Sequence, residues 1–248
     1  MPDESFRTVI ESLARTRSSS VGIFSDFCRL AACCVAAGSR EHEYLEVARA
    51  YARDELNEFS RGFALLVQEM EASPFTDVLG PYYLDIAAHS SKQARGEFFT
   101  PPELSKLIAR MVFDPDALKA EGKPITLNEP ACGSGGMVLA AAELFAPDSV
   151  DLLRVTAQDI NPVATDMCYL NLTLWGIPAR VIRGDTIRRT VSGDWRNIHW
   201  FRVGEEERQM IRRLQEVVAA EPEPEPSIDL GSFRAKREVG GQFEMDLF

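Results

Sequence analysis

A glycine-rich loop holds the residues best suited to bind a small ligand. Residues 128–136 read NEPACGSGG and stand between an apolar segment, residues 124–127, and a helical pattern, residues 136–145. A turn that leaves a strand and enters a helix presents backbone N–H groups, and its glycines let a ligand come close. The loop has neither the GxGxxG spacing of nicotinamide sites nor the GKS or GKT of nucleoside triphosphate sites, which disfavours both ligands.

An acidic residue, Asp159, ends the next apolar segment. It follows the loop by roughly twenty residues, the position at which dinucleotide-binding folds hold a ribose. A carboxylate there can accept hydrogen bonds from both ribose hydroxyls. The loop and Asp159 together favour a ligand that contains a ribose.

Strands and helices that would position these residues alternate along the chain. Apolar segments 124–127, 153–157 and 179–182 are typical of strands, and residues 136–145 and 161–175 are typical of helices. Ahead of them, Thr100 as N-cap, Pro101 at the first helical position and Glu103 predict a helix over residues 101–113. The alternation predicts an α/β fold with a parallel, doubly wound sheet.

The flanking segments predict further domains. Apolar residues at helical spacing between residues 5 and 90 indicate a helical N-terminal domain. Beyond Asp185, residues 190–197 predict a polar turn, residues 198–203 a short strand and residues 205–220 a charged amphipathic helix. The EPEPEP of residues 221–226 predicts an extended spacer. We therefore divide the chain into a helical domain (1–90), a ligand-binding domain (91–203), an amphipathic helix (204–220), a Pro/Glu-rich linker (221–241) and a terminal peptide (242–248).

Composition narrows the class of protein. A chain of 248 residues with 45% hydrophobic residues can bury the core of one large or two small domains. We find no apolar run of membrane-spanning length and no signal-peptide pattern, so we expect a cytoplasmic protein. The five cysteines form no CxxC pair, which predicts mostly buried thiols and disfavours both a metal site and disulfides.

The charge of the chain restricts any contact with nucleic acid. A net charge of −11 disfavours a protein that wraps nucleic acid over its whole surface, so DNA contact would be local. The arginine-rich residues 180–213 are the candidate for that contact. A solvated surface with salt bridges is an equally good interpretation of the same segment.

Three motifs in a fixed order carry a resemblance to a known family. The loop motif at residues 129–136 is preceded by GEFFTP, residues 96–101, and followed by DINP, residues 159–162. Together they resemble the modification subunit of type I restriction-modification systems and related N6-adenine DNA methyltransferases. The resemblance covers about residues 80–187. It implies a Rossmann-like S-adenosylmethionine-dependent methyltransferase core, S-adenosylmethionine as cofactor, and methyl transfer to adenine N6 in DNA.

The resemblance also implies roles for individual residues. Phe99, Thr100 and Pro101 would lie beside the methionine part of the cofactor, and Asp159 would bind the ribose. Asp185 would accept from the exocyclic amine of the cofactor adenine, with Ile160 and Thr186 flanking that ring. A turn-capping role is the alternative for Asp185. The residues implied for the binding loop are Glu129, Pro130, Ala131, Cys132, Gly133, Ser134 and Gly135.

One motif of the family is missing from the sequence. N6-adenine methylation uses Asn or Asp followed by Pro-Pro and an aromatic residue, whose oxygens accept from the target amine while the ring stacks on the flipped base. The sole Pro-Pro pair, Pro101-Pro102, belongs to the cofactor segment. Residues 194–197 and 199–201 offer acceptors and aromatic rings in its place, and the catalytic residues stay unassigned. The sequence also supplies only part of the family's sheet, so a partner completes the domain, the chain binds cofactor without methylating, or the acceptor site is an unfamiliar one.

The C-terminal peptide resembles a bacterial sliding-clamp-binding motif. Residues 242–248 read QFEMDLF, with Gln242, Met245, Leu247 and Phe248 as the anchors, and follow the Pro/Glu-rich linker. A few apolar anchors on a linker suffice for binding in a groove. The alternative is a tail that folds back on the domain or dimerises.

Two functions from different classes follow from these patterns. The first is an S-adenosylmethionine-dependent DNA methyltransferase acting on adenine N6, with DNA and a specificity or completing subunit as partners. The second is a non-catalytic module of a plasmid or phage that binds cofactor and DNA or a partner and is tethered to the sliding clamp. A third, weaker hypothesis is methylation of another planar nitrogen in RNA or protein.

Overall fold

A four-stranded sheet carries the glycine-rich loop. The computed structural model describes residues 4–17, 19–89 and 99–202. The sheet contains β1 (Ile125–Glu129), β2 (Leu153–Asp159), β3 (Ala179–Arg183) and β4 (Gly193–Arg196), in that spatial order. β1, β2 and β3 run parallel, with Leu127 opposite Val155 and Val155 opposite Ala179, so their carboxyl ends share one edge of the sheet. The three strands predicted from apolar segments are confirmed.

Two helices, α8 (Gly136–Glu143) and α9 (Pro162–Leu174), connect the parallel strands and share one hydrophobic core with them. α9 begins at the predicted place because the Asn161 side chain accepts from Val163 N at 2.8 Å and Pro162 takes the first helical position. Alternate β2 residues, among them Val155, are buried in this core. Both connecting helices belong to this one core. Among the described residues the structure therefore shows one of the two helical layers that a doubly wound sheet would have.

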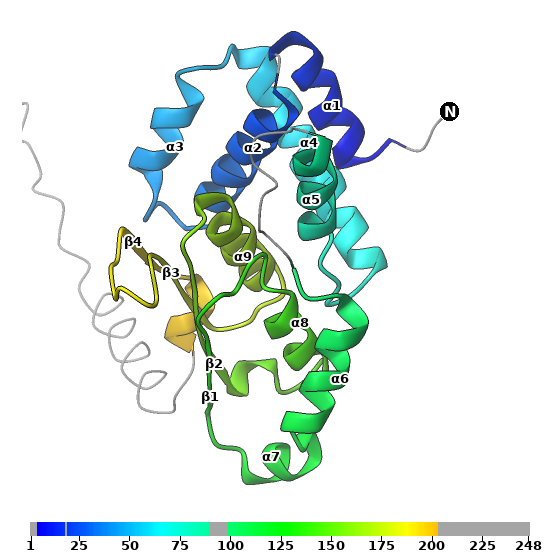
Figure 1. Cartoon of the computed structure of the whole chain (residues 1–248), viewed down its shortest axis with the longest axis vertical. Helices are drawn as coiled ribbons and strands as arrows, with labels where there is room; N and C mark the ends of the chain where they lie inside the picture. Colours follow the sequence, from blue (N-terminus) through cyan, green and yellow to red (C-terminus); the bar gives the residue numbers. More distant parts are fainter. Residues whose placement is uncertain (1–3, 18, 90–98, 203–248) are drawn as a thin grey trace, which may run out of the picture. The chain divides into compact units, whose positions relative to one another are not determined.

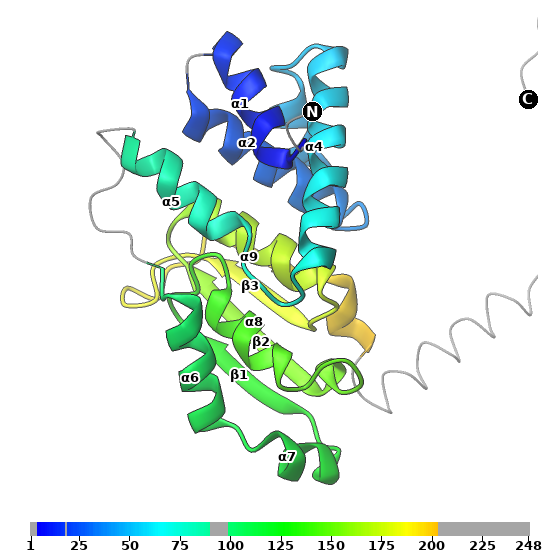
Figure 2. The ribbon, with the colours of Figure 1, turned by 90° about the vertical axis from the view of Figure 1, so that its right-hand side faces the viewer.

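Helix α6 (Pro102–Val112) packs against α8 (Figure 2). The helix expected over residues 101–113 is confirmed, but the prediction of Thr100 as its N-cap is wrong. Pro101 is the N-cap and Pro102 is the first helical residue. Proline suits that position because its missing N–H would have no partner there, so the second proline of the pair starts the helix. A further helix, α7 (Pro115–Glu121), is not predicted, although Asp114 caps it.

The segment after β3 differs from the sequence-based prediction at two places. Residues 190–197, predicted as a turn, contain β4, which pairs antiparallel with β3. The cause is tertiary, because Arg180 Nε donates to Asp194 Oδ1 at 2.9 Å across the pair. Residues 198–203, predicted as a strand, instead contain the 3₁₀ helix η2 (Ile198–Arg202). The Asn197 side chain accepts from both Ala179 N and Trp200 N at 3.1 Å, which turns the chain.

The N-terminal region is helical, as predicted. Its core is built of aromatic rings, with Tyr82 edge-on to Phe6 and Phe24 at 5.4 and 5.3 Å between centroids. Figure 1 shows α2 beside α9, and α2 also contributes Ala32 to the core of the sheet. The division of the chain at residue 90 stays a prediction. The helices are α1 (Phe6–Arg17), α2 (Ser20–Cys34), α3 (Glu41–Ala48), α4 (Arg53–Ala72) and α5 (Leu79–His89).

Two further findings bear on the composition-based predictions. Four of the five cysteines are buried and Cys34 is exposed, which confirms mostly buried thiols. Within the described part of the chain, no helix is both long and apolar enough to cross a membrane. The predicted helix over residues 205–220, the linker and the terminal peptide lie outside the described residues.

A buried ionic cluster joins the N-terminal helices to α9. The Arg40 side chain is fully buried, and its Nη2 donates to Asp166 Oδ1 at 2.7 Å and lies 2.8 Å from Glu43 Oε2. Arg29 Nε also donates to Asp166, and Trp195 Nε1 donates to Glu43 Oε1 at 3.0 Å. Two cations, two anions and an indole N–H therefore tie α2, α3, α9 and β4 together.

Glu43 should make the stability of the fold depend on pH. Burial raises the pKa of the Glu43 carboxyl, but hydrogen bonds from Arg40 and Trp195 and the charges of both arginines outweigh it, so that the pKa is lowered overall. A folded-state pKa below the unfolded one adds stability that is complete above about pH 5 and lost as the pH falls through the folded pKa. Thermal unfolding of Glu43→Gln should therefore lose less stability between neutral and acid pH than the unmodified chain.

The matched control is Glu46→Gln, because Glu46 is an exposed glutamate on the same helix, α3. Its unfolding should follow the unmodified chain at every pH. Identical pH profiles for Glu43→Gln and the unmodified chain would contradict the role assigned to Glu43.

Candidate active site

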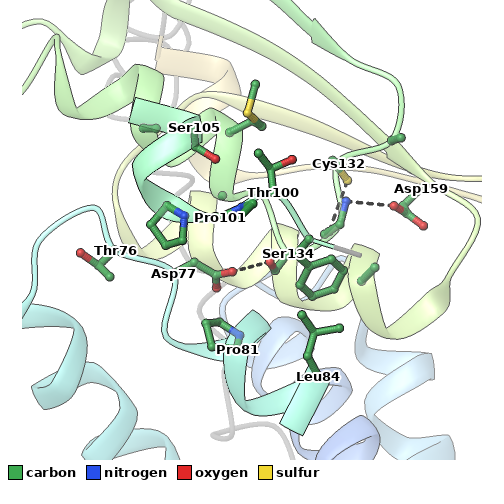
Figure 3. Close-up of a pocket in the computed structure, with 18 of the residues that line it drawn as sticks. Thr76, Asp77, Pro81, Leu84, Thr100, Pro101, Ser105, Cys132, Ser134 and Asp159 are labelled. Carbon is green, nitrogen blue, oxygen red and sulfur yellow. Dashed lines mark hydrogen bonds between the residues drawn. The ribbon is translucent and has the colours of Figure 1, made fainter. Parts of the chain in front are cut away.

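A cavity of about 1060 Å³ opens where β1 and β2 end (Figure 3). Its wall comes from three segments that lie far apart in the sequence: residues 99–106 at the start of α6, residues 131–140 after β1, and residues 159–164 after β2. Residues 75–84, at the start of α5, form the remaining side. The volume lies at the upper end of the range of about 300–1000 Å³ typical of small-molecule sites.

The cavity brings together many of the residues implied for cofactor binding. Those that line it are Phe99, Thr100, Pro101, Ala131, Cys132, Gly133, Ser134, Asp159 and Ile160. The other five, Glu129, Pro130, Gly135, Asp185 and Thr186, are not part of its wall. The convergence follows from the parallel strands, whose carboxyl ends place the two loops side by side.

Hydrogen bonds between the two loops fix the position of Asp159. Asp159 Oδ2 accepts from Gly133 N at 2.9 Å, and its Oδ1 accepts from Asn161 N at 2.9 Å. Cys132 N donates to Gln158 O at 2.8 Å, which continues the pairing of β1 and β2 into the loop. The carboxylate of Asp159 therefore joins the glycine-rich loop to the start of α9 at the edge of the cavity.

Gly133 is required for both its backbone conformation and its close packing. Its φ of +52° lies in the left-handed region, and a Cβ there would approach Phe99 Cδ1 to 2.9 Å. The absence of a side chain at Gly133 thus allows the ring of Phe99 to lie against the loop. Gly135, with φ of +93°, is the N-cap of α8.

Gly133→Ala should cost more stability than an otherwise similar glycine replacement. Gly122 provides the matched control, because its φ is +63° and a Cβ there would meet nothing within 4 Å. We expect Gly122→Ala to lower the free energy of unfolding by about 1 kcal/mol through backbone strain alone, and Gly133→Ala by about 1–2 kcal/mol more. Chemical denaturation measures both, and equal losses would contradict a steric contact with Phe99.

Of the five residues outside the cavity wall, three lie in loops beside it. Thr186 Oγ1 donates to Pro130 O at 2.7 Å and so connects the loop after β3 to the loop after β1. Asp185 Oδ1 accepts from Ile187 N and Arg188 N, both at 2.9 Å. These two bonds support the turn-capping alternative for Asp185, while its Oδ2 has an exposed partner, Arg188 Nε, at 3.7 Å.

Glu129 ends β1, and burial raises the pKa of its carboxyl. The negative charge of Asp159 raises the pKa further, and a hydrogen bond from Ala131 N offsets part of the effect. The two carboxylates at the ends of β1 and β2 therefore interact electrostatically.

The residues considered for the target base lie in and after β4, the outer strand on the side of the sheet away from β1. Asn197 caps the amino end of β3 through Ala179 N, and His199 Nε2 lies 3.0 Å from Thr173 O near the end of α9. Asp194 pairs with Arg180, and none of these side chains lines the cavity. Asp194, Asn197 and His199 thus use polar groups for contacts within the fold, and residues 194–201 do not form part of the cavity wall.

Several arginines of the arginine-rich segment contact other side chains of the fold. Arg180 pairs with Asp194, Arg183 lies 5.1 Å from the ring centroid of Trp195, and Arg196 lies 6.0 Å from that of Trp200. Arg188 and Arg189 are exposed, so both interpretations of the segment stay predictions. Residues 203–213 lie outside the described part.

Two polar residues of the cavity wall were not singled out from the sequence. Asp77 precedes α5 and accepts from Ser134 Oγ, Asn171 Nδ2 and Gly80 N. Ser105 on α6 is 1% exposed, and its hydroxyl has no partner among the described residues. The burial of Ser105 could have been predicted from its spacing, because it lies four residues before Ala109 on the same face of α6. Asp77 gives no such signal, because in the sequence it resembles an ordinary helix cap.

Known proteins similar to this chain fall into one functional class. Residues 75–219 match the family described as N-6 DNA Methylase. The type I restriction enzyme MpnII methylase subunit of Mycoplasma pneumoniae is 29% identical over 120 residues, which are 45% of this chain and 21% of that protein. The MjaIX methylase subunit of Methanocaldococcus jannaschii is 33% identical over 105 residues, 40% of this chain and 17% of that protein. The chain thus spans about a fifth of the length of these relatives.

Two solved structures also resemble the chain. A class I S-adenosylmethionine-dependent methyltransferase of Listeria monocytogenes, described as putative, aligns with a TM-score of 0.43 at 13% identity, over 73% of this chain and 53% of that one. The type I restriction-modification methyltransferase subunit of Streptococcus thermophilus aligns with a TM-score of 0.40 at 18% identity, over 75% of this chain and 40% of that one.

Proposed function

The chain belongs to the N-6 DNA methylase family, and on that premise we propose that it binds S-adenosylmethionine in the cavity and takes part in methyl transfer to adenine N6 of DNA. The observation that supports this most strongly is the convergence of residues 99–101, 131–134 and 159–160 on one cavity. These are the three motifs that carry the family resemblance.

The residues present suit the cofactor. Ser105 offers a buried hydroxyl without a partner in the described structure, and Gly133 leaves room for a ligand and for Phe99. Phe99, Thr100 and Pro101 would bind the methionine part, and Asp159 would accept from the ribose hydroxyls. Ile160 would contact the adenine ring, and Asp185 and Thr186 would reach it after a shift of their loop. The remaining loop residues, Glu129 to Gly135, would surround the methionine and ribose with backbone groups.

The bound cofactor would supply an electrophilic methyl group on a sulfonium, so that attack by the adenine N6 would break the methyl–sulfur bond, release the neutral thioether and be balanced by loss of a proton from N6. The chain's own contribution would be to hold the ligand in a fixed orientation and to keep water away from it. No described residue next to the cavity is assigned to the target base.

Because no residue of the described ranges is assigned to a base site, we also propose a second function, a cofactor-binding module that does not methylate by itself. Residues 194–201 lie at the far edge of the sheet, and among the described strands none pairs with the outer edge of β1. A second polypeptide would then supply the target-base site, in keeping with relatives that are named as subunits.

Two measurements separate these functions. Calorimetry with S-adenosylmethionine comes first, and failure to bind would overturn both. Transfer of a tritiated methyl group to DNA lacking N6-methyladenine then identifies the methyltransferase, and parallel reactions with RNA and protein test the third hypothesis. Binding without transfer to any of these substrates would support the module.

The C-terminal peptide, with Gln242, Met245, Leu247 and Phe248, lies outside the described residues and remains a proposed sliding-clamp ligand. Truncation after Gly240 tests it in a clamp-binding assay. Unchanged clamp binding by the truncated chain would show that the peptide is not the sliding-clamp ligand.

A further inference from the structure

We propose that Asp77 is a positioning residue that holds the glycine-rich loop in its ligand-binding shape at the methionine end of the cavity. The proposal rests on the proposed function, since it deepens the account of the same site. Asp77 lies more than fifty residues before the loop and reaches it only through the fold.

Asp77 and Asn171 hold Ser134 from two directions. Asp77 Oδ2 accepts from Ser134 Oγ, and Asn171 Nδ2 donates to Ser134 O at 2.9 Å. Asn171 Nδ2 also donates to Asp77 Oδ1 at 3.1 Å. The Ser134 side chain and backbone are therefore fixed by residues that are themselves hydrogen-bonded to each other.

The residues around this contact are closely packed. Asn171 is fully buried and Ser134 is 2% exposed. A Cβ on Gly80 would collide with both Asp77 Oδ2 and Ser134 Oγ and would come within 2.9 Å of Phe99 Cδ2. Gly80 N in turn donates to Asp77 Oδ1 at 3.0 Å, so the turn before α5 holds the carboxylate in place.

Two opposing effects act on the pKa of the Asp77 carboxyl, and the net direction is upward. Burial raises the pKa of Asp77, and the hydrogen bonds from Ser134, Gly80 and Asn171 lower it in part. The Asp77 carboxylate accepts from Ser134 in the loop, Gly80 in α5 and Asn171 in α9, so it connects the glycine-rich loop to both helices.

The position of Asp77 predicts an effect on one part of the cofactor only. In Figure 3 Asp77 and Asp159 lie on opposite sides of Ser134, and Thr100 and Pro101 line the same cavity. Loss of Asp77 should therefore weaken binding of the methionine part of the cofactor and spare the adenosine part, which Asp159 would hold.

The test compares Asp77→Asn and Ser134→Ala by calorimetry with two probes, S-adenosylmethionine and adenosine. We expect each variant to weaken S-adenosylmethionine binding about 10-fold, because one hydrogen bond to a charged group is lost, and to leave adenosine binding unchanged within about twofold. Since both variants remove the same hydrogen bond from Ser134 to a charged acceptor, the double variant should bind no more weakly than the weaker single one. Asp54→Asn, at an exposed aspartate in the first turn of α4, is the matched control.

The outcomes distinguish this inference from the proposed function. If the unmodified chain binds no S-adenosylmethionine, the proposed function fails and this inference fails with it. If it binds and both variants bind equally well, only the positioning role is overturned. Equal losses for S-adenosylmethionine and adenosine would also overturn it, because they would indicate a general disturbance of the fold.

Discussion

Asp159→Ala is expected to weaken S-adenosylmethionine binding by at least about 100-fold, which corresponds to about 2.7 kcal/mol. The variant would remove the proposed acceptor of the ribose hydroxyls. It would also leave two backbone donors, Gly133 N and Asn161 N, without the oxygens that they contact at 2.9 Å. Hydrogen bonds to a charged group contribute about 1.5–3 kcal/mol each, so loss of the two proposed bonds from the ribose hydroxyls alone reaches this size. Calorimetry measures it directly.

Two further variants separate the binding effect from a general one. Asp159→Asn keeps an oxygen for one of the two backbone donors and should bind with intermediate affinity. Asp151→Ala changes an exposed aspartate in η1 (Val150–Leu152), just before the amino end of β2, and should bind normally. Binding by Asp159→Ala within about threefold of the unmodified chain would show that the ligand does not use this carboxylate.

The elements that hold the cofactor loop could be predicted because their signals are local. Apolar segments mark β1, β2 and β3, and the glycines at residues 133–136 mark the turn into α8. Asn161-Pro162 marks the start of α9 through the cap and the first helical position. The cavity then follows from the rule that loops after parallel strands meet at one edge of the sheet.

The parts that could not be predicted depend on contacts between distant residues. β4 forms in a polar segment because its Asp194 and Trp195 contact Arg180 and Arg183 on β3. A strand preference that depends on such neighbours cannot be predicted from the local pattern. Asp77 reaches Ser134 across the fold, so no spacing in the sequence places it at the cavity. The role of Asn197, which had been considered for the target base, could not be predicted for the same reason, because its side chain contacts Ala179 N and Trp200 N only in the folded chain.

Asp166→Ala is expected to lower the free energy of unfolding by about 3–5 kcal/mol, the largest effect on stability anticipated in this chain. Asp166 has 2% of its side chain exposed and accepts from Arg29 and Arg40, whose side chain is fully buried. Without Asp166 the Arg40 charge would keep Glu43 as its one ion-pair partner among the described residues, and its Nη1 already has no hydrogen-bond partner there. An uncompensated buried charge is the reason for the large loss. Urea denaturation measures it.

The size of the effect depends on burial, so an exposed aspartate of the same kind is the appropriate comparison. Asp194→Ala also breaks an aspartate–arginine pair, but about a third of both its side chain and that of Arg180 is exposed, and the expected loss is below about 1 kcal/mol. Replacing both partners of the buried pair with apolar residues, Arg40→Met with Asp166→Leu, should restore part of the stability lost in Asp166→Ala, because it removes the stranded charge as well. If Asp166→Ala and Asp194→Ala lost equal stability, the cluster would be no more than a surface ion pair, and the attachment of α2 and α3 to α9 would have to come from apolar packing alone.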